Sequence, residues 1–327
     1  MTIANSKHPN LTTNTRKFIN ELEKSNSAPI YTLKYEEARK VLDNLQSDIK
    51  IPKDLDCNIS EIKVPFSNDK TVNIQIIKPL NSTEKLPIVI YFHGGGWVMG
   101  NNFTHRLLAR KIAIGANVGV VFVDYTPAPD AKYPVQLKEG FAVLEYISKN
   151  ASNYNLDASK IAIAGDSVGG NMTAIITLKA KEKYGAKIKS QILIYPVTDL
   201  TFSSQSYIDF ADGPWLTKKA MEYFLDAYLD DKSKLKDITV SPIYATKEQL
   251  GGLPETLVIT DENDVLRDEG EEYAAKLMEA GVKTTSVRYN GTIHDFVMLS
   301  PLVDTEPTKS AISQIVDVLK KSLWNNI

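Results

Sequence analysis

The segment Ile161-Ala-Ile-Ala-Gly-Asp-Ser-Val-Gly-Gly170 joins a short β-branched run to a Gly-x-Ser-x-Gly turn centred on Ser167. This is the pattern of a nucleophile elbow, in which an apolar strand delivers a serine to a tight turn. Glycine at positions 165 and 169 removes side chains that would collide there. A helix pattern over residues 171–183 follows, and the positive end of a helix dipole favours negative charge beside the serine. The alternative is a glycine-rich turn without chemistry, and the rest of the chain decides between the two.

The composition of the 327-residue chain is that of an ordinary globular protein, with 43% hydrophobic and 24% charged residues. A net charge of -2 and a pI near 6.2 leave no basic surface for nucleic acid or anionic lipid. The single cysteine, Cys57, has no partner for an internal disulfide or a zinc site, which indicates a reducing compartment. No secretory signal and no membrane span are visible in the sequence. We therefore expect a cytoplasmic protein.

Strand and helix patterns alternate along most of the chain. Period-two runs at 59–66 and 71–78 predict an antiparallel hairpin, and the later strand patterns alternate with helices. We expect an α/β fold with a mostly parallel sheet of eight strands, helices on both faces and a site at the strand carboxyl ends. The other strands are expected at 86–92, 119–124, 161–165, 190–195, 255–260 and 284–289, and the core helices at 103–116, 134–149, 171–183, 268–280 and 306–324.

Two segments depart from this alternation. Residues 12–47 carry two amphipathic helix patterns with no strand before them. Residues 199–241 separate two strands by a long stretch with one helix pattern and several aromatic side chains, and insertions of this length are usually functional. We expect residues 1–50 and 199–241 to form a helical cap on a core made of residues 51–198 and 242–327.

A serine nucleophile needs a base, and the chain has four histidines: His8, His93, His105 and His294. When the chain order is serine, acid, histidine, the base must follow Ser167. Only His294 does. It lies in the loop after the last predicted strand, at the sheet edge where the elbow also opens, so it is the candidate base.

The acid is expected after the penultimate strand, where residues 261–269 include five carboxylates. Asp268 and Glu269 fit the first turn of a helix, where carboxylates interact favourably with the helix dipole. The spacing leaves Asp264 and Asp261 as open alternatives for the acid.

A second glycine cluster, His93-Gly-Gly-Gly96, follows the predicted buried strand 86–92. At this composition the pattern would occur by chance about 0.0006 times. Successive glycines let backbone N–H groups approach a tetrahedral carbon closely, as an oxyanion hole requires. His93 is expected to orient this loop rather than to act as a base.

On these motifs the chain resembles the hormone-sensitive-lipase group of α/β-hydrolases, in particular its bacterial short-chain esterases (family IV). The motifs His93–Trp97, Gly165–Gly170, Asp264–Asp268 and His294–Phe296 occur in that family's order and spacing. The resemblance covers nearly the whole chain. It implies an α/β-hydrolase fold with a helical cap assembled from the two segments named above.

The resemblance also implies roles for single residues. Asp264 would be the acid that holds His294. The backbone N–H groups of Gly94, Gly95 and Val168 would form the oxyanion hole. Val168 stands where the family usually has alanine, and its β-branched side chain is expected to narrow the pocket wall.

One stretch, Asp124-Tyr-Thr-Pro-Ala-Pro-Asp130, departs from the family pattern. Thr126 stands where the family commonly has an arginine and cannot form that residue's ion pair. Pro127 removes a backbone donor. These changes affect the local scaffold, and the chemistry of the site does not depend on them.

Four aromatic side chains are candidates for substrate contact. Trp97 follows the oxyanion glycines, and Phe202, Phe210 and Trp215 lie in the insertion. The alternative for the three in the insertion is that they only attach the cap to the core. If they close a pocket, short acyl esters from acetyl to hexanoyl are preferred, with a maximum at about four carbons.

The expected function is hydrolysis of short-chain carboxylic esters by two-step acyl transfer, with a small-molecule ester as partner and no cofactor or metal. A dinucleotide-binding fold fits less well, because Met99 stands where the fingerprint that starts at Gly94 needs its last glycine. A non-hydrolytic small-ligand receptor on the same fold, or a lactone or amide hydrolase, stays an alternative. The sequence leaves a homodimer open.

Overall fold

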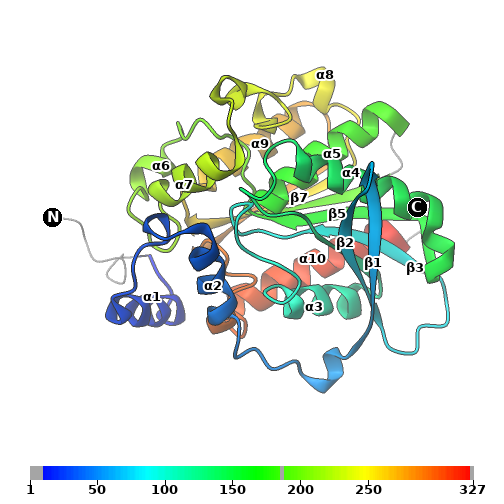
Figure 1. Ribbon diagram of the computed structural model, residues 1–327, viewed down its shortest axis with the longest axis horizontal. Helices are drawn as coiled ribbons and strands as arrows, with labels where there is room; N and C mark the ends of the chain where they lie inside the picture. Colours follow the sequence, from blue (N-terminus) through cyan, green and yellow to red (C-terminus); the bar gives the residue numbers. More distant parts are fainter. Residues whose placement is uncertain (1–9, 185–187, 325–327) are drawn as a thin grey trace.

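The structure is a computed structural model that describes residues 10–184 and 188–324 of the chain (Figure 1). Residues 1–9 of the expected N-terminal segment, His8 included, lie outside the described residues. All eight strands expected from the sequence are present, with somewhat different bounds. They are β1 (Cys57–Ser67), β2 (Lys70–Pro79), β3 (Leu86–Phe92), β4 (Gly119–Asp124), β5 (Leu156–Asp166), β6 (Ile188–Ile194), β7 (Glu255–Asn263) and β8 (Thr284–Ile293).

The eight strands form one sheet in the order β1-β2-β4-β3-β5-β6-β7-β8. β1 pairs with β2 and β2 with β4 in antiparallel orientation, and the remaining neighbours are parallel. The predicted antiparallel entry and mostly parallel sheet are therefore confirmed. β5 begins earlier than expected because Leu156 pairs with Leu86 before a register shift in the parallel ladder.

Helices cover both faces of the sheet (Figure 1). β3 is buried along its whole length, as its continuous apolar run predicts. Its residues Ile88 and Ile90 pack with α4 and α5, and Val89 and Tyr91 pack with α3 and α10 on the opposite face. These helices and their neighbours are α3 (Arg106–Ala116), α4 (Val135–Asn150), α5 (Val168–Tyr184), α8 (Lys247–Leu250), α9 (Arg267–Glu279) and α10 (Glu306–Trp324).

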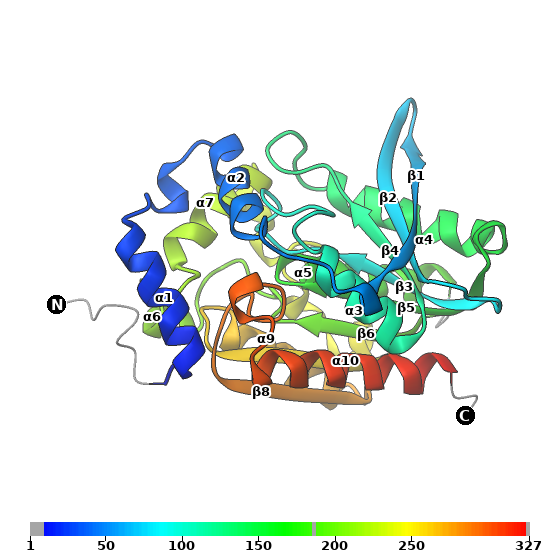
Figure 2. The ribbon, with the colours of Figure 1, turned by 90° about the horizontal axis from the view of Figure 1, so that it is seen from below.

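The two segments outside the alternation meet at the carboxyl ends of the strands. Helices α1 (Thr13–Ser25) and α2 (Tyr35–Leu45) lie beside α6 (Ser206–Asp209) and α7 (Lys218–Tyr228) in both views (Figures 1 and 2). The rings of Tyr35 and Tyr223 are 4.8 Å apart, and Tyr223 Oη donates to Leu33 O at 3.2 Å. The short helices α6 and α8 were not predicted, because four residues are too few for a helical periodicity to appear in the sequence.

A buried glutamine fixes the end of the N-terminal segment to the core. Gln46 is 0% exposed, and its Nε2 donates to Thr104 O at 2.9 Å and to Met298 O at 2.8 Å. Its Oε1 accepts from Ser300 N at 2.8 Å. The segment after α2 is therefore held by a satisfied polar network. Among the described helices, none has the length and apolar character needed to cross a membrane.

Candidate active site

Ser167 occupies the turn between β5 and α5 with a φ of 55°, in the left-handed region that L-residues rarely adopt. A Cβ on Gly165 would lie 2.3 Å from Gly169 O, and one on Gly169 would lie 2.0 Å from Phe92 O. Glycine is therefore required at both positions, as the sequence predicts. Helix α5 begins at Val168, earlier than expected, so Ser167 lies directly at the helix N-terminus.

Three side chains from three loops meet at this turn. His294 Nε2 lies 3.0 Å from Ser167 Oγ, and His294 Nδ1 lies 2.7 Å from Asp264 Oδ2. Because the carboxylate can only accept, Nδ1 carries a hydrogen, and Nε2 of the neutral ring accepts from the serine hydroxyl. All three residues are at least 97% buried, since the most exposed of them shows 3%. Of the two acids that the spacing left open, Asp264 contacts the imidazole.

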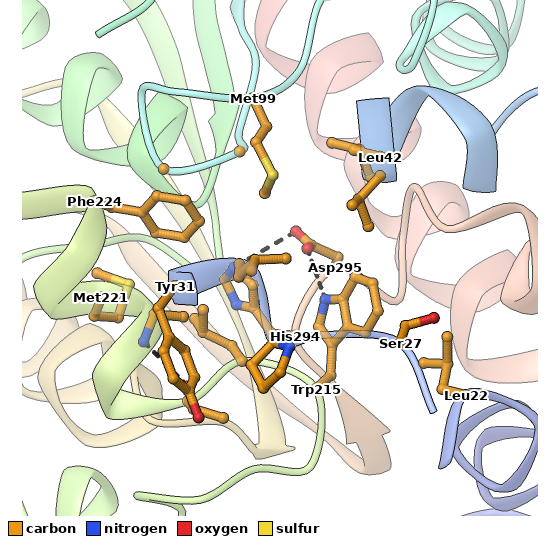
Figure 3. Close-up of a pocket in the computed structure, with 18 of the residues that line it drawn as sticks. Leu22, Ser27, Tyr31, Leu42, Met99, Trp215, Met221, Phe224, His294 and Asp295 are labelled. Atoms are coloured by element: carbon orange, nitrogen blue, oxygen red, sulfur yellow. Dashed lines mark hydrogen bonds and ion pairs between the residues drawn. The ribbon is translucent and has the colours of Figure 1, made fainter. Parts of the chain in front are cut away.

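The surroundings of His294 raise its pKa from 6.5 to about 9. Burial alone lowers this pKa, but the negative charges of Asp264 and Asp295 and the hydrogen bond to Asp264 outweigh it. Asp295 Oδ1 lies 3.5 Å from His294 Nε2, and Trp215 Nε1 donates to Asp295 Oδ2 at 2.9 Å (Figure 3). The sequence contains Asp295 in its His-Asp-Phe motif but gives no signal that the carboxylate faces the His294 imidazole.

The glycine loop lies beside the elbow, and its first amide is already used. Gly94 N donates to Asp166 Oδ1 at 3.1 Å, which corrects the expectation that Gly94 contributes to an oxyanion hole. Gly95 and Gly96 line the cavity next to Ser167. The sequence did not single out Gly96, because a run of three glycines does not show which amide is bound elsewhere.

Asp166 joins the glycine loop to the elbow. It is 0% exposed, and its carboxylate accepts from Tyr91 Oη at 2.7 Å and from Gly94 N, with His105 Nε2 3.3 Å away. Burial acts to raise its pKa, but His105 and Tyr91 bring the pKa below the ordinary value. The ionised side chain thus fixes two backbone segments relative to each other, a role that the sequence pattern did not reveal.

His93 orients the loop, as expected from the sequence. Its Nδ1 donates to Gly94 O at 2.8 Å, and its ring stacks on Tyr125 with centroids 4.1 Å apart. Burial, and then the nearby His105, lowers its pKa to about 3, so the ring stays neutral. No hydrogen bond of the described residues joins His93 to Ser167.

The stretch 124–130, where the chain departs from the family pattern, has its own support. Thr126 N and Oγ1 donate to the Glu139 carboxylate at 2.9 and 2.6 Å. Arg39 of α2 forms an ion pair with Asp130 at 3.1 Å and donates to Ala128 O at 3.1 Å. An arginine from the N-terminal segment therefore supplies an ion pair to this loop.

A cavity of about 300 Å³ opens onto Ser167 and His294 (Figure 3). Trp215 lines it, as predicted, while Val168 does not and is 0% exposed within the core. The N-terminal segment contributes a wall that was not predicted residue by residue. Apolar lining residues from the two segments are Ile19, Leu22, Ala28, Pro29, Ile30, Val41, Leu42, Leu216, Ala220, Met221 and Phe224.

The other three predicted substrate contacts lie outside the lining of this cavity. Trp97 is 0% exposed and stacks on Tyr228 of α7 with centroids 3.9 Å apart. The ring of Phe202 packs on that of Tyr207, with centroids 5.0 Å apart. Cζ of the Arg267 guanidinium lies 5.1 Å from the centroid of the Phe210 ring. These predictions are corrected: within the described residues the three rings pack the insertion onto itself and the core, the alternative that the sequence left open for two of them.

Among the described residues, side chains of metal-ligand type come close together at Asp261, Asp264 and His294. Both nitrogens of His294 are engaged there, one with Asp264 and the other with Ser167. Neither ring nitrogen is therefore free to bind a metal ion in this arrangement, and we place no metal on the cluster.

Comparison with known proteins identifies the family. Residues 89–298 match the model of the α/β-hydrolase fold. The chain is 44% identical over 306 residues to an α/β hydrolase of Acanthamoeba polyphaga mimivirus, covering 94% of this chain and 86% of that protein. The chain belongs to the hormone-sensitive-lipase-like α/β-hydrolases.

Proteins named as esterases are similar to this chain over most of its length. A carboxylesterase of Mycobacterium tuberculosis is 34% identical over 259 residues, which cover 78% of this chain and 81% of that protein. A thermostable esterase of Pseudomonas putida has a TM-score of 0.92 and 40% identity, covering 97% of this chain and 98% of that one. The predicted fold and the prediction of a serine carboxylesterase are confirmed.

Proposed function

We propose that the protein hydrolyses short-chain carboxylic esters through Ser167, His294 and Asp264 with an acyl-enzyme intermediate. The hydrogen-bonded chain from Ser167 Oγ through the imidazole to Asp264 carries this proposal. Ser167 Oγ attacks the ester carbonyl carbon while His294 Nε2 takes its proton. His294 then protonates the leaving alcohol oxygen, and a water molecule repeats the sequence to release the acid. Asp264 accepts from Nδ1 throughout and stabilises the imidazolium.

The oxyanion that forms on the carbonyl oxygen needs donors with free hydrogens. We assign this role to the amides of Gly95, Gly96 and Val168. Gly95 and Gly96 line the cavity beside Ser167. Val168 is the first residue of α5, and the first amides of a helix have no partner within it. Fixed backbone donors of this kind stabilise the charge that develops in the transition state.

The cavity supports a preference for short acyl chains. Residues 1–50 and 199–241 act in this proposal as a cap, because both contribute apolar lining above Ser167. Each methylene that enters an apolar pocket contributes about 0.8 kcal/mol. The value of kcat/KM should therefore rise with acyl length until the cavity is filled, at about four carbons, and then fall.

Mutation of the nucleophile tests the proposal. Ser167→Ala should abolish hydrolysis of p-nitrophenyl butyrate and labelling by a fluorophosphonate, with an unchanged circular dichroism spectrum. Ser152→Ala, at an exposed serine, is the matched control and should retain both properties. Turnover of Ser167→Ala near that of the wild type would overturn the assignment of the nucleophile.

A further inference from the structure

Asp261 is a buried carboxyl group that the proposed mechanism does not use. It lies near the carboxyl end of β7, three residues before Asp264, and its side chain is 0% exposed. Neither of its oxygens has a hydrogen-bond partner in the part of the chain that the structure describes. An ionised carboxylate in such a place would be strongly unfavourable, because burial removes its water and nothing replaces it.

Among the described residues, an ionised Asp261 has no hydrogen-bond donor beside it. A protonated Asp261 does have an acceptor nearby, because the Asp264 carboxylate is within reach. One oxygen of Asp261, one oxygen of Asp264 and one ring nitrogen of His294 all lie within 4.8 Å of one another. Asp264 is supplied with donors, since Oδ2 binds His294 Nδ1 and Oδ1 accepts from Leu266 N at 3.1 Å. Two carboxyl groups so close together do not both ionise, and the one without donors keeps the proton.

The negative charges near Asp261 also favour its protonated form. Burial, and then the negative charges of Asp264 and Asp295, raises the pKa of Asp261 well above its ordinary value. From β8, Tyr289 pairs with Asp261 in the sheet register. From the end of β6, the ring of Tyr195 lies near His294 and contributes no charge, because burial raises its pKa as well.

We propose that Asp261 is a positioning residue that stays protonated and donates its carboxyl hydrogen to Asp264. This inference rests on the proposed triad. The hydrogen bond would fix the Asp264 carboxylate in the plane that receives His294 Nδ1. It would also keep the acid pair at a single negative charge, so that Asp264 rather than a second anion sets the basicity of the imidazole.

Two variants of Asp261 distinguish a neutral hydrogen-bond donor at this position from a negatively charged carboxylate. Asp261→Asn keeps the shape of the side chain and supplies an N–H donor. The value of kcat/KM should therefore stay within about threefold of the wild type, and the rising limb of its pH profile should not move. Asp261→Ala removes the donor, so kcat should fall about tenfold, and the rising limb of the pH profile should move to higher pH because the Asp264 carboxylate then shares none of its charge with a hydrogen from Asp261 and stabilises the imidazolium more. A clear move of the limb to lower pH in Asp261→Asn would show that Asp261 is an anion and would overturn the proposal.

Infrared spectroscopy gives a readout that does not depend on activity. At neutral pH the wild type with ¹³C-labelled aspartate should show the carbonyl stretch of a protonated aspartic acid, and Asp261→Asn should lack that band. Glu269→Gln is the control, because Glu269 is also buried, accepts from the amides of Thr198 and Asp199 and makes no hydrogen bond to the triad within the described residues. It should leave the aspartate band in place.

The absence of a protonated aspartate band in the wild type would overturn the inference even if a variant did not fold. Failure of the proposed function would look different. In that case Ser167→Ala would retain turnover, whatever the infrared spectrum of Asp261 showed.

Discussion

The two sides of the cavity are held by different kinds of interaction. On the core side, backbone geometry fixes the elbow, since Ser167 N donates to Ile194 O at 2.8 Å and Asp166 holds the Gly94 amide. On the cap side, contacts between segments far apart in sequence form the wall. For example, the ring centroids of Phe18 and Trp215 are 5.6 Å apart. The groups proposed to react thus lie in loops that buried polar contacts hold in place, while the apolar wall of the cavity depends on packing between the two segments.

The core side should show the largest effect of a single substitution. Asp264→Asn should lower kcat about 10⁴-fold, because the amide can no longer hold His294 in the tautomer that accepts from Ser167. KM should change little. Steady-state kinetics on p-nitrophenyl butyrate measure both constants, with Asp261→Asn as the neighbouring control. A larger loss in Asp261→Asn than in Asp264→Asn would reverse the assignment of the acid.

Substitution in the glycine loop should lower kcat nearly as much as Asp264→Asn does. A Cβ on Gly96 would lie 2.3 Å from the Phe224 ring, at a φ of +67°, so Gly96→Ala must displace the loop that carries the amides proposed to bind the oxyanion. We expect a loss of about 10² to 10³ in kcat. Gly281→Ala is the matched control, because its φ is +78° and nothing lies within 4 Å of the added methyl group. Equal losses in both variants would mean that backbone strain alone is responsible.

The core side could be predicted closely because its constraints are local. Tight turns require glycine at 165 and 169, and the strand pattern places Ser167 and His294 at one sheet edge. Asp264 was separated from Asp261 only by the family resemblance, since three residues of spacing do not fix which side chain faces the base. Gly94 was assigned wrongly because its partner, Asp166, lies 72 residues away in the sequence.

The cap side could not be predicted to the same depth. Its aromatic residues were visible in the sequence, but whether a ring faces the cavity depends on packing between distant segments. Trp97 turns away because it stacks on Tyr228, whereas Trp215 faces the cavity and binds Asp295. No periodicity in a loop encodes this difference.

The pH dependence of the reaction tests the ionisation of His294 and the effect of Asp295, which binds Trp215 of the cap side, on that ionisation. The imidazole must be neutral to accept a proton, and its pKa is raised from 6.5 to about 9. Therefore kcat/KM should rise with pH through this ionisation and level off above it. Asp295→Asn removes one of the negative charges that raise this pKa, so its rising limb should move to lower pH. Measurement from about pH 5 to about pH 10 checks this, and a flat profile would contradict a histidine base.

The cap side should show the smallest effects on rate and the clearest effect on selectivity. Trp215→Leu enlarges the cavity and should move the preferred p-nitrophenyl ester to a longer acyl chain, with a change of only a few fold in kcat/KM. Phe210→Leu should leave the chain-length profile unchanged and lower the free energy of unfolding by about 1 to 2 kcal/mol, because that ring packs outside the cavity. A wild-type maximum at long-chain esters would contradict the enclosed pocket.

The acyl-enzyme itself is the most direct test of the account. The wild type is mixed with p-nitrophenyl butyrate, quenched in acid during turnover and analysed by intact mass and peptide mapping. We predict one butyryl group on Ser167, formed together with a burst of p-nitrophenol and absent from Ser167→Ala. A butyryl group on another side chain, or turnover with no adduct and no burst at saturating ester, would contradict nucleophilic catalysis by Ser167.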